Sequence, residues 1–148
     1  MAERLPVALT AIAEVCLALR VRRLARRVSR YYDRVLAPLG LDSSQFNILP
    51  VIGAAGPVAL MELARMLDLD PSTLSRALKT LRVKGFISII GGRGRGGLTL
   101  ALTEPGEELM ALSVTAWKSA QHDLVTALGS ADIGRIVDSF DRLDQAAK

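Results

Sequence analysis

A short run of hydroxyl and basic side chains has the composition of a nucleic-acid contact. The run contains Ser72, Thr73, Ser75, Arg76, Lys79 and Thr80. Short hydroxyls can meet phosphates or base edges, and an arginine can pair with the edge of a guanine. Residues 71–102 contain six bases and no acid, and phosphate binding needs such a local excess. The same side chains would also suit the solvated outer face of an ordinary helix, so the surrounding elements must decide.

These residues are predicted to lie on a helix that begins at residue 71. Asp70 is placed to cap the free N–H groups of the first turn, and Pro71 occupies the first helical position, where its missing donor costs nothing. Apolar residues fall on one face of this helix, while the hydroxyl and basic residues fall on the opposite face. One side should therefore pack and the other reach outward.

The flanking patterns predict a winged helix-turn-helix. Helices are expected over about 6–37, 43–54 and 61–67, with Pro50 bending the second. After the helix at 71, "FISII" and "LTLALT" are strand-like and are joined by "GGRGRGG", whose Arg93 and Arg95 could enter a minor groove. Two further helices follow Thr103 and Gly129. The expected fold is mainly α, with six helices and a small wing of two to three β-strands.

Catalysis and metal binding find no support in the residue inventory. The chain of 148 residues has one histidine, His122, and one cysteine, Cys16, so it offers no Ser-His-Asp or Cys-His set. No Lys-Ser/Thr pair follows the glycine-rich turn, as a phosphate loop would need. We therefore expect no enzyme, no metal and no cofactor.

Charge is distributed unevenly along the chain. Residues 1–37 hold eight arginines against three acids, whereas residues 103–148 hold four bases against eight acids. The two ends are therefore expected to lie against each other, within one chain or across a dimer. Glu14 interrupts the amino-terminal apolar stretch, so no signal peptide is expected, and Pro and Gly break the run 46–63, so no membrane span is expected. These features and the single cysteine favour a cytoplasmic protein.

Three segments carry a resemblance to a known family. "LGLDSSQFNIL", "ELARMLDLDPSTLSRALKTLRVKGFI" and "LTLALTEPGEELM", in this order of helices and wing, resemble the MarR family of bacterial regulators. The resemblance covers essentially the whole chain. It implies one domain that forms an obligate homodimer through helices in 1–40 and 104–148, with 41–103 as the winged DNA-binding lobe. It also implies a repressor that binds a pseudo-palindromic operator in double-stranded DNA, with recognition helices roughly 34 Å apart.

The wing departs from the family pattern. Such proteins usually carry an Asp-x-Arg motif before the second wing strand, but Gly94 and Gly96 stand at those positions here. Arg93 or Arg95 would take the arginine role with a shift of one residue, without the ion pair that braces the loop.

Five arginines form a stripe on the first helix. Arg20, Arg23, Arg27, Arg30 and Arg34 follow alternating steps of three and four. In one interpretation they pair with the acidic carboxyl-terminal segment across the dimer. In the other, the resemblance implies a cleft for a small anionic or aromatic effector, and its candidate residues are Arg20, Arg23, Arg27, Tyr31, Tyr32 and Phe46, with Trp117 as a further aromatic wall.

Three alternatives remain open at this stage. Cys16, next to Arg20 on the stripe, could be a redox switch, as in the hydroperoxide-sensing branch of the family. The same basic face could also serve a non-specific architectural DNA-binding protein. A winged-helix module that binds only protein is the third, and the acid-free segment speaks against it.

Overall fold

Helices dominate the computed structural model, which describes residues 4–91, 98–129 and 132–147. In chain order, the elements of this part are α1 (Arg4–Val15), α2 (Leu17–Leu36), the 3-10 turn η1 (Ala37–Leu39), α3 (Ser43–Ala55), β1 (Val58–Ala59), α4 (Leu60–Met66), α5 (Pro71–Val83), β2 (Ile87–Gly91), β3 (Leu98–Leu102), α6 (Glu104–Leu128) and α7 (Ile133–Ala146). The predicted mainly α fold with a small β wing is confirmed.

The wing is a three-stranded antiparallel sheet in the order β1-β3-β2. Ile87 of β2 stands opposite Leu102 of β3, and Val58 of β1 stands opposite Leu100. Strand β1 has only two residues, which is too short to show a period in the sequence. Its pairing attaches the start of the helix-turn-helix to the wing.

The hydrophobic core belongs to the segment from α2 to α6. Its large, fully buried side chains are Leu36, Ile48, Leu49, Ile52, Leu63, Leu74, Leu81 and Leu100. The leucines from α5 are those predicted for its packed face, and they meet α3, α4 and the sheet. Helix α7 contributes no buried residue.

The first helix differs from the prediction, because it is divided at Cys16. The backbone of Cys16 is extended there, with φ −60° and ψ 112°. The guanidinium of Arg20 bonds the carbonyl oxygen of Glu14 through Nε at 2.7 Å and through a second nitrogen. A carbonyl satisfied by a side chain no longer needs the regular helical partner, so the helix can break there. The described part of the chain therefore has seven α-helices instead of the six expected.

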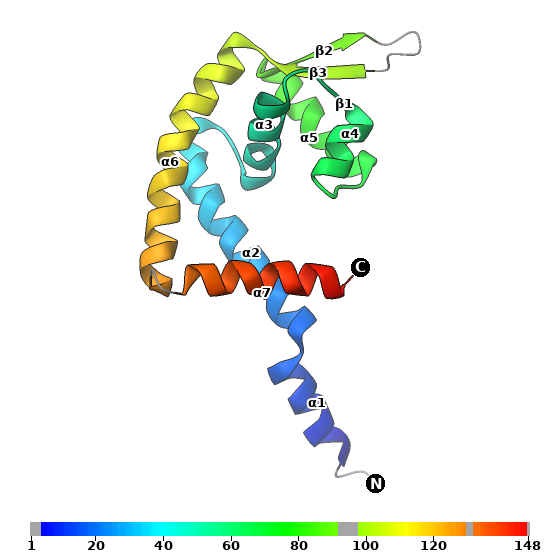
Figure 1. Ribbon diagram of the computed structural model, residues 1–148, viewed down its shortest axis with the longest axis vertical. Helices are drawn as coiled ribbons and strands as arrows, with labels where there is room; N and C mark the ends of the chain where they lie inside the picture. The colour runs from blue at the N-terminus through cyan, green and yellow to red at the C-terminus, as the bar shows by residue number, and fades with distance from the viewer. Residues whose placement is uncertain (1–3, 92–97, 130–131, 148) are drawn as a thin grey trace.

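Helices α2 and α6 pack together and carry the winged lobe (Figure 1). The Tyr31 hydroxyl donates to Asp123 at 2.9 Å, and the Tyr32 hydroxyl donates to the Gln121 side chain at 2.9 Å. The bond to Asp123 raises the pKa of Tyr31, and burial raises the pKa of Tyr32. Both hydroxyls remain protonated donors at neutral pH, so the two helices stay joined.

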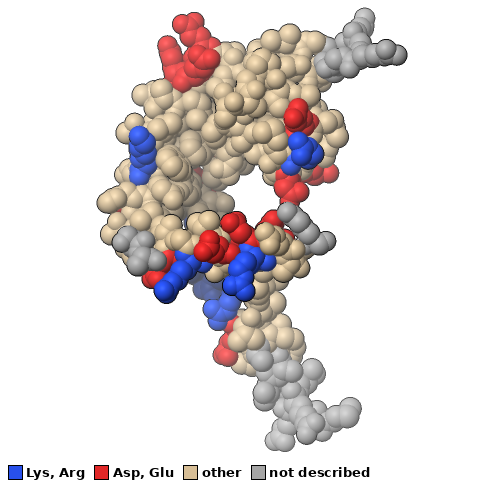
Figure 2. All heavy atoms as spheres, viewed as in Figure 1, with Lys and Arg blue, Asp and Glu red and all other residues tan. Residues whose placement is uncertain are grey.

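Helices α1 and α7 and the first part of α2, here called the arms, extend away from this lobe. In Figure 1, α1 lies at the end of the molecule opposite the wing, and α7 crosses the view below the lobe. Figure 2 shows an opening between α7 and the lobe, and it shows acidic and basic side chains close together over α7. The arms therefore leave much of their surface uncovered by their own chain.

Candidate nucleic-acid interface

Asp70 fixes the amino-terminal end of α5. Its carboxylate accepts hydrogen bonds from the backbone N–H of Ser72 at 2.8 Å, the backbone N–H of Thr73 at 3.3 Å and the Ser72 hydroxyl at 2.5 Å. Pro71 takes the first helical position, as predicted. The bonds from Ser72, and that from Thr73, hold the pKa of Asp70 below its ordinary value, so the cap is ionised at neutral pH. The hydroxyl proton of Ser72 is engaged by this cap, which leaves its oxygen as an acceptor.

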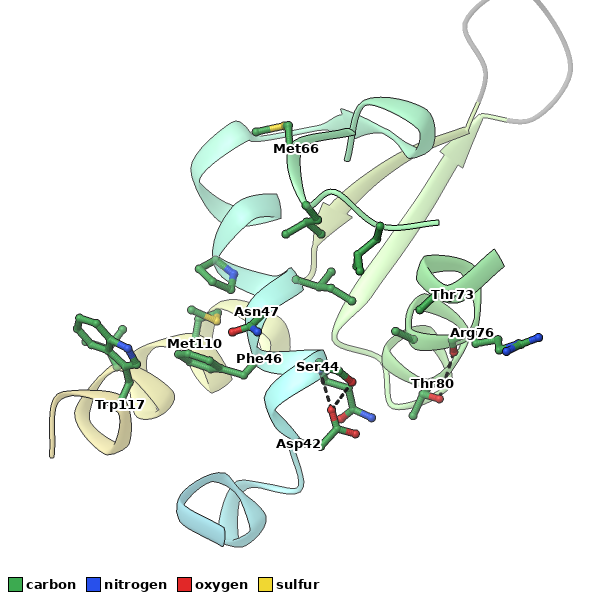
Figure 3. A pocket seen from close by; sticks show the side chains of 17 residues that line it. Asp42, Ser44, Phe46, Asn47, Met66, Thr73, Arg76, Thr80, Met110 and Trp117 are labelled. Atoms are coloured by element: carbon green, nitrogen blue, oxygen red, sulfur yellow. Dashed lines mark hydrogen bonds between the residues drawn. The ribbon is translucent and has the colours of Figure 1, made fainter. Parts of the chain in front are cut away.

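The outer face of α5 carries the residues predicted to contact DNA. Exposed side chains on this helix are Ser72, Thr73, Ser75, Arg76, Lys79 and Thr80. The Arg76 side chain extends away from the protein body (Figure 3). In the described residues, no ion pair engages Arg76, Lys79 or Arg82. A helix face with free guanidinium and ammonium groups beside hydroxyls is suited to a polyanion that also offers base edges.

A groove of about 400 Å³ separates α5 from the wing. Its floor is apolar and includes Leu78 from α5, Ile89 from β2 and Leu100 from β3. Its rim is polar and basic, and comprises Ser75, Arg76, Lys79 and Arg82. The predicted wing contacts Arg93 and Arg95 lie outside the described residues. The described rim nevertheless continues the basic face of α5 toward the sheet.

A larger cavity of about 1030 Å³ lies on the other side of α5, between α3, α5 and α6. Phe46, Met110 and Trp117 supply its apolar lining (Figure 3). Thr73 and Thr80 also line it, and both were predicted as DNA contacts. Thr73 and Thr80 are seven residues apart, which is two helical turns. This spacing could have indicated from the sequence that both lie on one face of the helix. Helix α5 is thus one wall of the cavity.

The predicted effector residues do not line one pocket within the single chain. Phe46 lies in the large cavity, whereas Arg20, Arg23 and Arg27 line a separate groove with Glu14 at the break between α1 and α2. Tyr31 and Tyr32 bond to α6 between these two places. Residues on one stripe of a long helix are spread along its length, about 1.5 Å per residue, so shared direction does not bring them together.

Cys16 is half-buried at the break between α1 and α2. Arg20, the predicted neighbour of its thiol, directs its guanidinium to the Glu14 carbonyl. The pairing that motivated a redox role is thus not the contact that Arg20 makes here.

The described residues show neither a metal site nor a membrane span. No group of three or more His, Cys, Asp or Glu side chains is placed to hold a metal ion in this part of the chain. Among the same residues, no helix has the length and apolar character needed to cross a membrane.

Comparison with known proteins agrees with this architecture. The MarR family model matches residues 39–95. The M. tuberculosis transcriptional regulator MosR, in a crystal structure with DNA, has a TM-score of 0.78 and 30% sequence identity, with 89% of this chain and 96% of MosR covered. The chain belongs to the MarR family. The MarR-family resemblance of the three sequence segments is thereby confirmed.

Two curated relatives match this MarR-family chain over part of their length. Multiple antibiotic resistance protein MarR of Salmonella typhimurium is 33% identical over 82 residues, which are 55% of this chain and 57% of the relative. The Bacillus subtilis regulator YwoH, described as an uncharacterized HTH-type transcriptional regulator, is 26% identical over 88 residues, 60% of this chain and 64% of its own. The chain thus matches somewhat more than half the length of either relative.

Proposed function

We propose that the protein is a homodimeric transcriptional regulator that binds a pseudo-palindromic operator and acts as a repressor. The observation that carries the proposal is the outer face of α5, where exposed Arg and Lys side chains form no ion pair among the described residues, lie beside hydroxyl side chains and adjoin the wing groove. This combination is the footprint of a helix that enters a major groove. MosR, 30% identical, is known in complex with DNA, which supports the same partner here.

Exposed apolar side chains on the arm helices support the homodimer. Leu9 and Ile12 of α1, Leu17 of α2 and Phe140 of α7 are each more than half exposed, at 57%, 55%, 54% and 52%. Large apolar side chains in a row along uncovered helices are typical of a protein interface. A second copy would cover them with residues 1–40 and 104–148, leaving the winged lobes 41–103 to contact DNA.

Charge favours the same arrangement of the arms. Helix α2 carries the arginine stripe, whereas α7 carries Asp138, Asp141 and Asp144. Placing α7 of one copy near α2 of the other would set opposite charges side by side, which fixes register and orientation more than affinity.

Selection from a genomic DNA library with the purified protein tests this function. We expect enrichment of an inverted repeat, with operator affinity about 10³-fold or more above that for random DNA. Sedimentation should give two copies per repeat. Binding that depends on salt but enriches no sequence would establish an architectural protein instead. Absence of any binding would contradict the proposal.

The large cavity supports a small anionic or aromatic effector. Phe46 and Trp117 offer aromatic faces, and Arg76, which lines the cavity and extends outward, would meet an anionic group only at its mouth. Because Thr73, Arg76 and Thr80 belong both to the cavity lining and to the proposed DNA face, a ligand in the cavity would compete with operator binding through α5 itself.

A melting-temperature screen with aromatic carboxylates and acyl-thioesters tests the effector. We expect a binding compound to raise the melting temperature and to weaken operator binding, with both effects lost in Trp117→Ala. Arg23→Ala is the matched control, because Arg23 lines the separate groove. If Arg23→Ala abolishes the response and Trp117→Ala does not, the ligand sits in that groove. A screen without any shift would count against an effector of this class.

A further inference from the structure

The carboxyl-terminal end of α5 is tied to the junction between α2 and α3 by one side chain. The ammonium of Lys84 donates to the backbone carbonyl oxygen of Gly40 at 2.6 Å and to the side-chain oxygen of Gln45 at 3.3 Å. These partners lie 44 and 39 residues away in sequence. No local pattern in the sequence indicates the contact.

Both acceptors are held in place by other bonds. Gly40 ends the 3-10 turn in the left-handed region, with φ 70°, and its N–H bonds the Ala37 carbonyl at 2.9 Å. The Gln45 residue is 8% exposed, and its backbone N–H bonds the Asp42 carboxylate at 2.8 Å. The Gly40 carbonyl also stands at the end of the helical run from α2, where the helix dipole favours a cation. Lys84 therefore bonds to a prepared site.

The donor side is equally well defined. Gly85, with φ 78°, follows Lys84 and closes α5: its N–H bonds the Arg82 carbonyl at 2.9 Å, and the Phe86 N–H bonds the Leu81 carbonyl at 3.0 Å. This closure fixes the backbone of Lys84, the residue that caps the carboxyl-terminal end of α5. Within the described residues, Lys79 and Arg82 on the same helix have no comparable partner.

We propose that Lys84 is a positioning residue, which sets the orientation of α5 relative to α2, and that it does not bind DNA phosphates. The proposal rests on the proposed function, in which α5 is the recognition helix. Because α2 leads into the dimerisation arm, the tie would set the angle and separation between the two recognition helices. It would thereby make the protein selective for the spacing between operator half-sites.

Lys84→Met tests this role, since it keeps the aliphatic stem and removes the donor. Lys79→Met is the matched control on the outer face. Affinities would be measured for the operator, for operators with one base pair added or removed between half-sites, and for random DNA, each across a salt series.

We expect Lys84→Met to bind the operator about tenfold more weakly, because a charged hydrogen bond is lost. The variant should discriminate less between spacings, while random-DNA affinity and the slope of log K against log salt remain parental. Lys79→Met should weaken binding to all sequences and reduce that slope by about one. Lys84→Arg, which retains a donor, should restore part of the spacing preference.

In the DNA measurements, two outcomes would overturn the assignment. A salt slope reduced by about one in Lys84→Met, with equal losses on operator and random DNA, would make Lys84 a phosphate contact. If Lys84→Met keeps the affinity and the spacing preference of the parent, the Lys84 contact does not orient α5. If the parent selects no operator, the proposed function fails, and amide hydrogen exchange still tests the tie. Lys84→Met should speed exchange at Leu41 and Gln45, and unchanged exchange would refute the positioning role.

Discussion

Arg76→Ala is expected to lower operator affinity by a factor of about 5 to 150 and to relax base preference at one position in each half-site, the equivalent of about 1–3 kcal/mol. Arg76 is exposed on the outer face of α5 and extends from the protein body (Figure 3). Its planar guanidinium can donate two hydrogen bonds to one guanine edge, whereas alanine offers none. Selection with the variant, compared with the parent, measures both changes.

Lys79→Ala provides the contrast, one turn along the same face. A lysine that neutralises a phosphate should weaken binding to operator and random DNA alike, and its loss should lower the salt slope by about one. If Arg76→Ala and Lys79→Ala lose selectivity to the same extent, the division between base reading and phosphate binding is wrong. Both side chains are exposed, so neither variant should change the melting temperature appreciably.

Gly106→Ala is expected to destabilise the fold on the order of 3 kcal/mol, which would lower the melting temperature by roughly 6–12 °C. A Cβ atom at residue 106 would overlap the backbone carbonyl oxygen of Phe86 and lie 3.0 Å from the carbonyl carbon. That oxygen also accepts the Thr103 N–H at 3.1 Å, so it cannot move away without breaking the start of α6. Thermal and urea unfolding measure the loss.

Gly134→Ala is the matched control for this effect. Gly134 lies in α7, its backbone is helical and no atom lies within 4 Å of the Cβ it would gain. Alanine in such a place should be neutral or stabilising by up to about 1 kcal/mol. A Gly106→Ala protein that melts like the parent would mean that α6 does not begin against Phe86.

Local signals explain most of what the sequence predicted. The start of α5 followed from Asp70 and Pro71, and the start of α6 from Thr103, because a cap acts within three residues of itself. The buried face of α5 followed from helical periodicity. The wing followed from a change of period after Gly85.

Features that depend on distant partners were missed. The break at Cys16 depends on a guanidinium that reaches a carbonyl six residues earlier, and β1 exists because Val58 and Ala59 pair with β3. The tie from Lys84 joins residues far apart in sequence.

The candidate site was predictable to different degrees. Exposure of the predicted contact residues on α5 followed from the helical wheel, because outward direction is a local property. The predicted effector residues lie at three places along the molecule, because a stripe gives direction around a helix and says nothing about which distant element covers each turn. The conformation of the glycine-rich turn could not be predicted, because glycine residues permit many backbone conformations.

Helix α7 buries no residue against its own chain, although it has 14 residues and a well-separated apolar side. An isolated helix of this length is only marginally stable in water. In the proposed homodimer, association would supply the stability that α7 lacks within one chain, so folding and assembly would be one equilibrium governed by mass action. Dilution alone should unravel the arms while the winged lobe, with its own core, remains intact.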